Sequence, residues 1–486
     1  MNEQIKTLKP QALWTNFAKL NAVPRPSKKE ERVIEFMMNF GKALGLETSQ
    51  DAVGNVLIKK PASKGMEDRK TVVLQSHLDM VHQKNNDTDF DFDTQGIEMY
   101  VEGDWVKAKG TTLGADNGLG VAAIMSILES KDIAHPAIEA LFTIDEETGM
   151  TGAMGLEAGV LSGDILLNLD TEDDDELSVG CAGGIDLTAT RNYEEEAVDQ
   201  SKTAYTIEIK GLSGGHSGMD IHKGLGNANK IMNRLLFDGY ENYGLRIAQI
   251  HGGSLRNAIP RESHALVVVD QIQAEAFEFE FKLLAKTIKK EQKKTDPNLK
   301  IKLSISALPS KVMDLGVQEG FLKTMYSAHN GVYRMSPDIA DLVETSNNIA
   351  RVSLAAGFIQ VLCLTRSSVE STKIDLSNAL RAAFELSGME VELSGSYPGW
   401  QPDMGSSILK EMKALYIEMF QEEPNIMACH AGLECGLLGT HYPEMEMISF
   451  GPNIRGAHSP DEKASISSSQ KFWSYLLKTL ENIPSK

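Results

Sequence analysis

The sequence predicts an α/β protein in which a mainly parallel sheet, covered by helices, is interrupted by an inserted α+β domain. Apolar strands alternate with helices in the first part of the chain, which is the pattern of such a sheet. A second set of strands and long helices fills the middle, and a further apolar strand follows near the C-terminus. At 486 residues the chain exceeds the size of a single hydrophobic core, so we expect at least two domains.

The first part opens with helices predicted at 10–22 and 29–44. Four short apolar strands follow: NVLIKK, TVVLQSHLD, IEALFTIDEE and DILLNLDTED. A helix that begins with glycines, over 118–130, separates the second of these strands from the third. Strand–helix–strand alternation is typical of parallel sheets, whose ligands bind at the carboxyl ends of the strands.

The middle part has predicted strands at 203–212, 264–273, 299–308, 358–368 and 389–398, with helices at 225–237, 273–293 and 370–387. Two segments, 254–270 and 345–366, are each followed by a helix, which indicates an internal duplication into two α+β halves. We therefore expect a first domain made of 1–186 and 398–486, with 187–397 inserted into it.

Composition excludes several classes of protein. A formal charge of −20 disfavours nucleic acids and anionic membrane surfaces as partners, because both require a basic face. No apolar run approaches the roughly 18 residues of a membrane span, and MNEQIKTLKPQALW has no apolar signal core. Four scattered cysteines do not form a disulfide framework. These features predict a soluble cytoplasmic protein.

Ionisable residues follow the apolar strands at the ends where ligands of parallel sheets bind. In VLQSHLDMVHQ (73–83), His77 and Asp79 are spaced i, i+2 and so share a face. Read alone, this stretch leaves a solvated strand edge and a metal or catalytic site equally open. The recurrence of the pattern favours a functional site, and it adds Asp145, Glu146 and Glu147, then Asp170, and His458 after the strand near the C-terminus.

Asp116 lies in TTLGADNGLG, where a helix begins. As an isolated residue it would be read as a helix N-cap, but the surrounding glycines let the backbone bend towards a ligand. The two histidines and three carboxylates offer nitrogen and oxygen donors without a thiolate, which suits zinc, cobalt or manganese. With one carboxylate shared, five such ligands hold two ions about 3.5–4 Å apart, and a remaining glutamate is free to act as a base.

The motifs SHLDMV, GADNG, TIDEETG, NLDTED and GAHSPDE, in this order, resemble the di-zinc M20 metallopeptidase family. Within it the resemblance is to the aminoacyl-histidine dipeptidase branch (Xaa-His dipeptidase, or bacterial carnosinase), and it covers nearly the full chain. It implies a di-metal hydrolase domain with an inserted lid domain. It also implies a cytosolic, homodimeric enzyme that cleaves Xaa-His and related, carnosine-like dipeptides.

Carried over residue by residue, the resemblance assigns Asp116 as the ligand that bridges two divalent ions. His77 and Asp170 would complete one site, and Glu147 and His458 the other. The ions would be zinc, with cobalt or manganese as alternatives. The remaining roles fall to Glu146, as general base, and to Asp79, which would hold the His77 ring in one tautomer.

The resemblance also assigns residues to the inserted domain. His216, in SGGHSGMDI, would stabilise the oxyanion that forms during the reaction, and Asn257, in GGSLRNAIPR, would bind substrate. Arg366 either clamps the substrate carboxylate or forms a salt bridge within the lid. In HAGLECG (430–436), the Gly432 backbone would approach the substrate and Glu434 would meet its α-amino group. We interpret three other histidines as structural or surface residues: His82, His222 and His251.

Alternative functions differ in what they require. Another amidase of the same fold, such as an aminoacylase, a deacetylase or a tripeptidase, would differ around Arg366 and 430–436. A non-catalytic binding module would have lost the base or the ligands, whereas all six positions hold competent residues. A dinucleotide-binding domain is disfavoured because GADNGLG lacks the GxGxxG spacing.

Overall fold

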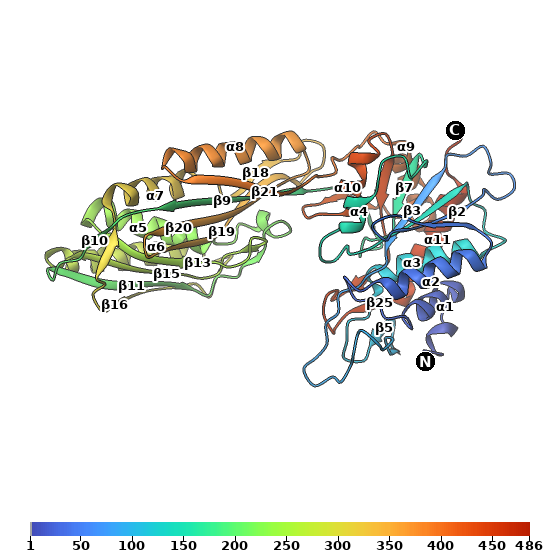
Figure 1. Cartoon of the computed structure of the whole chain (residues 1–486), viewed down its shortest axis with the longest axis horizontal. Helices are drawn as coiled ribbons and strands as arrows, with labels where there is room; N and C mark the ends of the chain where they lie inside the picture. Colours follow the sequence, from blue (N-terminus) through green and yellow to red (C-terminus); the bar gives the residue numbers. More distant parts are fainter. Residues whose placement is uncertain (1) are drawn as a thin grey trace. The chain divides into compact units, whose positions relative to one another are not determined.

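The computed structural model describes residues 2–486, which cluster into two compact units (Figure 1). Unit 1 comprises Met1–Gly180, Pro402–Ala428 and Leu433–Lys486, and unit 2 comprises Cys181–Gln401 and Cys429–Gly432. The predicted boundaries at 186/187 and 397/398 lie within six residues of the main transitions between the two units. Unit 2 also takes the short segment 429–432, which no pattern in the sequence separates from its neighbours.

Unit 1 is built on a mixed sheet of eight strands in the described residues. Their spatial order is β1 (Glu47–Gln50), β2 (Val56–Lys60), β6 (Ile138–Thr143), β3 (Val72–His77), β7 (Ile165–Asn168), β23 (Glu446–Ser449), β8 (Glu176–Cys181) and β22 (Asn425–Cys429). The four central strands, β6, β3, β7 and β23, run parallel to one another. These are the four strands whose ends carry the acidic and histidine motifs.

The prediction of a mainly parallel sheet is corrected by the flanking strands. β1 pairs with β2, β2 with β6, and β23 with β8, each in the antiparallel sense. Residues 51–55 alone connect β1 to β2, and so short a connection closes a hairpin, whereas parallel neighbours need a longer crossover. The sheet is therefore parallel at its centre and antiparallel towards its edges.

Helices and a small sheet complete unit 1. α3 (Ala115–Glu129) packs against β3, and 13 of its 15 residues are buried, as its apolar sequence on all sides requires. The other helices of unit 1 are α1 (Gln11–Leu20), α2 (Glu31–Ala43), α4 (Thr151–Gly155), α9 (Ser407–Phe420), α10 (Glu434–His441) and α11 (Ile466–Glu481), and its small sheet has the order β24 (Ile454–Arg455), β25 (Lys463–Ser465), β5 (Trp105–Ala108) and β4 (Met99–Glu102).

Unit 2 is built mainly on a long antiparallel sheet, and its helices share a large apolar core with that sheet (Figure 1). The sheet order is β16 (Lys300–Ile305), β11 (Lys202–Lys210), β15 (Ser263–Asp270), β13 (Arg246–Gly252), β19 (Val343–Ala355), β20 (Phe358–Ser367), β9 (Gly183–Asn192) and β21 (Glu390–Tyr397), and β18 (Gly331–Met335) pairs with β19. The helices are α5 (Ala228–Tyr243), α6 (Ala274–Glu291), α7 (Leu315–Ser327) and α8 (Glu370–Leu386).

The two halves of this sheet have the same topology. In the half β11–α5–β13–β15–α6–β16 and in the half β9–α7–β19–β20–α8–β21, the first strand lies between the third and the fourth. β13 and β19, the second strand of each half, pair where the halves meet. The segments 254–270 and 345–366, which suggested a duplication, each contain the third strand of a half, β15 or β20, but only the second segment also contains most of the second strand of its half, β19.

Most predicted helices and strands are confirmed within three residues at one or both ends, including the helices at 118–130, 273–293 and 370–387. Strand β19 was not predicted, because polar residues in VETSNNIARVSLA interrupt its apolar pattern.

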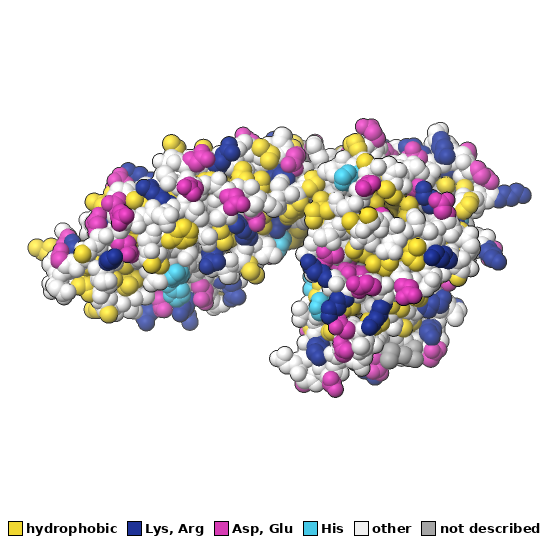
Figure 2. Space-filling model, in the orientation of Figure 1, with side chains coloured by type: hydrophobic (Ala, Val, Ile, Leu, Met, Phe, Trp, Pro, Cys, Tyr) yellow, Lys and Arg dark blue, Asp and Glu magenta, His cyan; other side chains and the backbone are white. Residues whose placement is uncertain are grey.

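Acidic and basic side chains are interspersed over the face visible in Figure 2. Among residues 2–486, no helix combines the length and the apolar character needed to cross a bilayer.

Candidate metal centre and active site

The predicted ligands of unit 1 meet where its four parallel strands end. His77 is the last residue of β3, Asp170 follows β7 by two residues, and Glu146 and Glu147 lie in the loop after β6. His458 comes from the loop between β24 and β25, and Asp116 from the first turn of α3. The carboxyl edge of the sheet therefore gathers residues as distant in the chain as His77 and His458.

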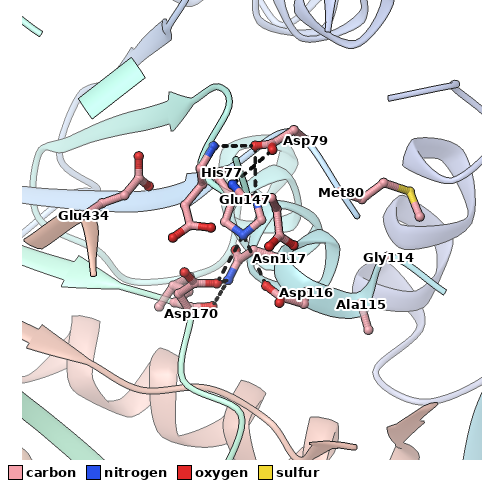
Figure 3. Close-up of polar contacts among 12 residues, drawn as sticks. His77, Asp79, Met80, Gly114, Ala115, Asp116, Asn117, Glu147, Asp170 and Glu434 are labelled. Carbon is pink, nitrogen blue, oxygen red and sulfur yellow. Dashed lines mark hydrogen bonds and ion pairs between the residues drawn. The ribbon is translucent and has the colours of Figure 1, made fainter. Parts of the chain in front are cut away.

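These side chains form two groups that share one carboxylate. The Nε2 atom of His77 lies 3.1 Å from Asp116 Oδ1 and 3.5 Å from Asp170 Oδ1 (Figure 3). The Nε2 atom of His458 lies 3.3 Å from the other oxygen of Asp116 and 3.0 Å from Glu147 Oε2. In each group the potential ligand atoms lie within 4.8 Å of one another. Asp116 thus faces both groups, one oxygen to each.

Asp79 supports this arrangement from behind. Its Oδ1 atom lies 3.3 Å from Nδ1 of His77, the ring nitrogen that faces away from Asp116. The same carboxylate accepts hydrogen bonds from the backbone N–H groups of Glu146 and Glu147 and from the Ser27 hydroxyl. One buried carboxylate therefore lies against the His77 ring and binds the loop that carries the two glutamates (Figure 3).

The turn before α3 brings Asp116 into position. Gly114 adopts a left-handed conformation with φ of 68°, and an added Cβ there would lie 2.6 Å from the Arg25 guanidinium. Asp116 and Asn117 have non-helical dihedrals, and the peptide bond between them is cis. The Asn117 amide donates to the Leu169 carbonyl and to Asp170, which ties the helix start to the end of β7.

The loop after β6 is shaped by Asp145, whose side chain is buried. Its carboxylate accepts the hydroxyl groups of Thr148 and Thr151, and its carbonyl accepts the N–H groups of Gly149 and Met150. This closed loop presents Glu146 and Glu147 side by side. Potential ligand atoms of both glutamates lie within 4.8 Å of one another and of a His77 ring nitrogen.

The concentration of carboxylates perturbs their protonation. Burial raises the pKa of Glu146 well above its usual value, and the neighbouring carboxylates Asp170, Glu434 and Glu147 raise it further, against the effect of His77. Burial also raises the pKa of Asp170 to about 6, although His77 opposes this. Carboxyl groups this close together disfavour the charged state of one another. A cation at the centre would relieve this repulsion.

The two histidines respond in the opposite direction. Burial alone would lower the pKa of His77, but Asp170, Asp116 and Asp79 together hold it well above its usual value. Hydrogen bonds to Asp116 and Glu147 raise the pKa of His458 to about 11. Burial would raise the pKa of Asp116, yet the two imidazoles hold it well below its usual range.

The residues present fit two divalent cations. All donors are carboxylate oxygens and imidazole nitrogens, which are ligands of zinc and of similar ions. The Oε1 atom of Glu147 is buried and has no hydrogen-bond partner among the described residues. Buried polar atoms are ordinarily satisfied, so this oxygen has the character of a ligand atom rather than of a structural acceptor.

Three of the residues predicted in the inserted domain lie together within unit 2. His216, on β12 (Gly215–His216), pairs with Ala258 on β14 (Ala258–Ile259), the residue after Asn257. Ser217 links this pair of strands to Arg366, because its N–H donates to the Asn257 carbonyl and its hydroxyl lies 3.4 Å from the Arg366 Nε atom. Gly432 lies in the same unit, in the segment 429–432.

Arg366 is buried, and its partners in unit 2 are hydroxyl groups. Besides Ser217, its Nη1 donates to the Tyr397 hydroxyl at 2.8 Å. No carboxylate lies within ion-pair distance of Arg366 among the described residues. The lid salt bridge that was one of the two predictions for this residue is therefore absent from unit 2 as described.

Glu434 lies in unit 1, at the start of α10. Its Oε2 atom accepts hydrogen bonds of 2.7 Å from both the Gln75 amide and the Thr143 hydroxyl. The Oε1 atom is buried and has no hydrogen-bond partner in the part of the chain that the structure describes. Burial raises the pKa of this carboxyl to about 7.

Two residues with a structural part in the site were not singled out from the sequence. Arg25, in VPRPS, is buried and donates to the carbonyls of Leu78, Asp79 and Gly114. Glu462 ends the motif GAHSPDE and is also buried. The position of Arg25 between two prolines is only a weak signal of a role in the site. Glu462 could have been found, because it lies in the motif GAHSPDE. His82, interpreted as a structural or surface residue, is exposed and contacts the Phe92 ring.

Comparison with known proteins places these features in a family. The model of peptidase family M20/M25/M40 matches residues 73–482. A cytosol non-specific dipeptidase of Escherichia coli (strain K12) is 42% identical over 483 residues, which cover 99% of this chain and 100% of the relative. The crystal structure of an aminoacylhistidine dipeptidase from Vibrio alginolyticus is 45% identical, covers 99% of this chain and 98% of its own, and superposes with a TM-score of 0.95. Aminopeptidase PepT from Bacillus cereus, at 16% identity and a TM-score of 0.57, covers 98% of this chain and 99% of its own and shares the fold.

Proposed function

Because the chain belongs to peptidase family M20/M25/M40, we propose that it is a metal-dependent dipeptidase that hydrolyses Xaa-His dipeptides and related, carnosine-like ones. Two relatives that align over nearly the whole chain are named as dipeptidases, one as non-specific and one as acting on aminoacylhistidine. The observation that carries the proposal is the pair of ligand groups sharing Asp116.

We assign His77, Asp116 and Asp170 to one ion, and Asp116, Glu147 and His458 to the other. The ions are zinc, with cobalt or manganese as alternatives. When bound, two such ions polarise the scissile carbonyl and lower the pKa of the attacking water. The chain supplies the rest: Asp79 keeps the Nε2 atom of His77 directed towards the centre, and Asp116 sets the separation of the two groups.

Glu146 is the general base in this proposal. Its side chain lies beside His77 and Glu147 but is not needed for either ligand group, so it remains available to accept a proton. A base works best when its pKa lies near the working pH, and the surroundings of Glu146 raise its pKa in that direction. Glu146 would then pass the proton to the leaving amine.

Unit 2 would act as a lid that contributes His216. The Nδ1 atom of His216 accepts the backbone N–H groups of Gly218 and Met219, so the ring proton resides on Nε2. The environment also lowers the pKa of His216, through burial and the nearby Arg366. A neutral ring with a fixed Nε2–H is a donor suited to the negative charge that develops on the carbonyl oxygen. The repeated topology of this unit supports an internal duplication.

The ends of the substrate would be recognised by opposite charges. Arg366, a buried cation without a carboxylate partner in unit 2, would bind the substrate carboxylate, with Asn257 beside it. In unit 1, the unpartnered Oε1 atom of Glu434 would accept the α-amino group. The backbone of Gly432, in unit 2, would also contact the substrate. We further propose a homodimer in the cytoplasm, the compartment named for the Escherichia coli relative.

A substrate panel on zinc-reconstituted protein tests the proposal. We expect Ala-His and β-Ala-His to be hydrolysed with values of kcat/KM about 10- to 100-fold above those of Ala-Leu and Ala-Lys. A pocket that hydrogen-bonds the histidine side chain is left with unpaired polar groups when another side chain occupies it. The tripeptide Ala-Ala-His and N-acetyl-His should be poor substrates. Equal rates for all dipeptides would contradict the preference for histidine, and faster cleavage of N-acetyl-His would favour an aminoacylase instead.

A further inference from the structure

The buried carboxylate of Glu462 accepts hydrogen bonds from four consecutive backbone N–H groups. Its Oε2 atom accepts those of Leu113 at 2.7 Å and Gly114 at 2.9 Å. Its Oε1 atom accepts those of Ala115 at 2.7 Å and Asp116 at 3.3 Å. Glu462 is 2% exposed, so water does not compete for these bonds.

Such an arrangement requires both a charged acceptor and a particular backbone. An ionised carboxylate is acceptor-only and has room for four donors, and its hydrogen bonds are stronger than those of a neutral acceptor. A left-handed residue turns consecutive N–H groups towards one anion, and here that residue is Gly114, with φ of 68°. The conformation of 113–116 therefore depends on Glu462.

Glu462 is itself part of the turn that carries His458. Its N–H donates to the Ser459 carbonyl at 3.0 Å, and the Ser459 N–H donates to the Gly456 carbonyl at 3.2 Å. His458, immediately before Ser459, faces Asp116 at 3.3 Å. The carboxylate of Glu462 thus joins the loop of one candidate ligand to the loop of another.

Arg25 holds the same loop from its other side. Its guanidinium donates to the Gly114 carbonyl and to the carbonyls of Leu78 and Asp79, just after His77 at the end of β3. Figure 3 shows the chain at Gly114 and Ala115 leading into Asp116 beside His77. The N–H groups of the loop are bound by Glu462 and one of its carbonyls by Arg25, so little freedom remains for Asp116.

We propose that Glu462 is a positioning residue, which sets the distance between Asp116 and His458 and so determines how tightly the centre holds its ions. This inference rests on the proposed metal centre. Residues that orient metal ligands from behind ordinarily change metal affinity by about 10- to 100-fold when they are replaced.

Two substitutions of Glu462 distinguish the effect of its negative charge from the effect of its side-chain length. Glu462→Gln keeps the size of the side chain but replaces one acceptor oxygen by an NH2 group, which would face two N–H donors. Glu462→Asp keeps the charge but is one methylene shorter, so it cannot serve both pairs of N–H groups. Asp461→Asn is the matched control, because it removes one negative charge from the neighbouring, exposed residue of the same loop.

The measurement is zinc affinity of the chelator-stripped protein, by competition with a chromophoric chelator, together with far-UV circular dichroism and melting temperature. We expect wild type and Asp461→Asn to bind two ions with equal affinity. Glu462→Gln should retain the fold and bind at least one ion about 10- to 100-fold more weakly, and Glu462→Asp should be weakened about 10-fold. A purely structural role would lower the melting temperature of these variants and leave zinc affinity unchanged.

A folded Glu462→Gln protein that binds two ions as tightly as wild type overturns the inference. If that variant does not fold, Glu462→Asp decides in the same way. A wild-type protein that takes up no zinc overturns the proposed metal centre itself, and this inference with it, whereas a normal wild-type titration with unaffected variants refutes the role of Glu462 alone.

Discussion

At the residue scale, neighbouring ionisable groups have different tasks. His77 faces Asp116 and Asp170 through Nε2, while Asp79 contacts Nδ1 of the same ring. The i, i+2 spacing predicted that these two residues would share a face, and the structure places them in contact. His82, five residues after His77, is exposed and takes no part. The single stretch left two interpretations open because the partners of His77 lie on other strands.

The proposed base is tested by Glu146→Gln. This change keeps the shape of the side chain but removes the proton acceptor, so kcat for Ala-His should fall about 10²- to 10⁴-fold while the zinc content stays at two ions per chain. Steady-state kinetics and elemental analysis of the same sample measure both quantities. The exposed Glu157→Gln serves as the control. Near-normal turnover of a fully metallated Glu146→Gln protein would exclude Glu146 as the base.

Glu434 provides a test in the pH dependence of stability. Burial raises the pKa of this carboxyl from 4.5 to about 7 in the folded protein. The folded state therefore binds the proton more tightly than the unfolded state, so stability falls as the pH rises from about 4.5 to 7. Above pH 7 the buried charge costs about 3 kcal/mol, at about 1.4 kcal/mol for each pKa unit.

Glu434→Gln removes that cost and retains an oxygen for the Gln75 and Thr143 donors. The melting temperature of the chelator-treated variant should exceed that of wild type by several degrees at pH 8, and the difference should shrink towards zero at pH 5. The exposed Glu444→Gln should show no such trend. A difference between Glu434→Gln and wild type that does not change between pH 5 and pH 8 would contradict the assigned shift.

At the element scale, the sequence predicted which strand ends carry the candidate ligands, but not the strand order of the sheet or the side chains that hold the ligand loops. Apolar strands that end in acids or histidine predicted the carboxyl edge formed by β6, β3, β7 and β23. The antiparallel flanks were not predicted, because strand order depends on contacts across the sheet. The parts played by Arg25 and Glu462 also escaped prediction. Apart from Asn21, the partners of these two side chains lie 53 to 349 positions away in the chain, and no local pattern reports such a contact.

The start of α3 depends on glycines that make room for Arg25. A Cβ added at Gly118 would lie 2.6 Å from the Arg25 guanidinium and 2.9 Å from the Phe17 ring. We expect Gly118→Ala to cost about 1–3 kcal/mol of stability through overpacking, and to weaken zinc binding by displacing the helix start.

Gly439→Ala is the matched control, since Gly439 also lies in a helix but has only an ordinary contact at 3.9 Å. Thermal melting and zinc titration of both variants measure the effect. If Gly118→Ala behaved like Gly439→Ala, close packing of Arg25 against α3 would not be required for the site.

At the scale of the whole molecule, the ligands of unit 1 come from both ends of the chain, and unit 2 is inserted between them. A change in element pattern in the sequence predicted the long insertion, and the internal duplication stays a proposal. The transfer of 429–432 to unit 2 was not, because four residues carry no periodicity of their own. Composition limited the class of protein, but only the five motifs together identified the chemistry.

The central claim is that one chain holds two ions through two ligand groups joined by Asp116. A crystal structure of the zinc-loaded protein, with anomalous data collected at the zinc edge, tests this most directly. We predict two anomalous peaks about 3.5–4 Å apart. One should contact His77, Asp116 and Asp170, and the other Asp116, Glu147 and His458. A single peak, or two peaks that do not share Asp116, would contradict the account.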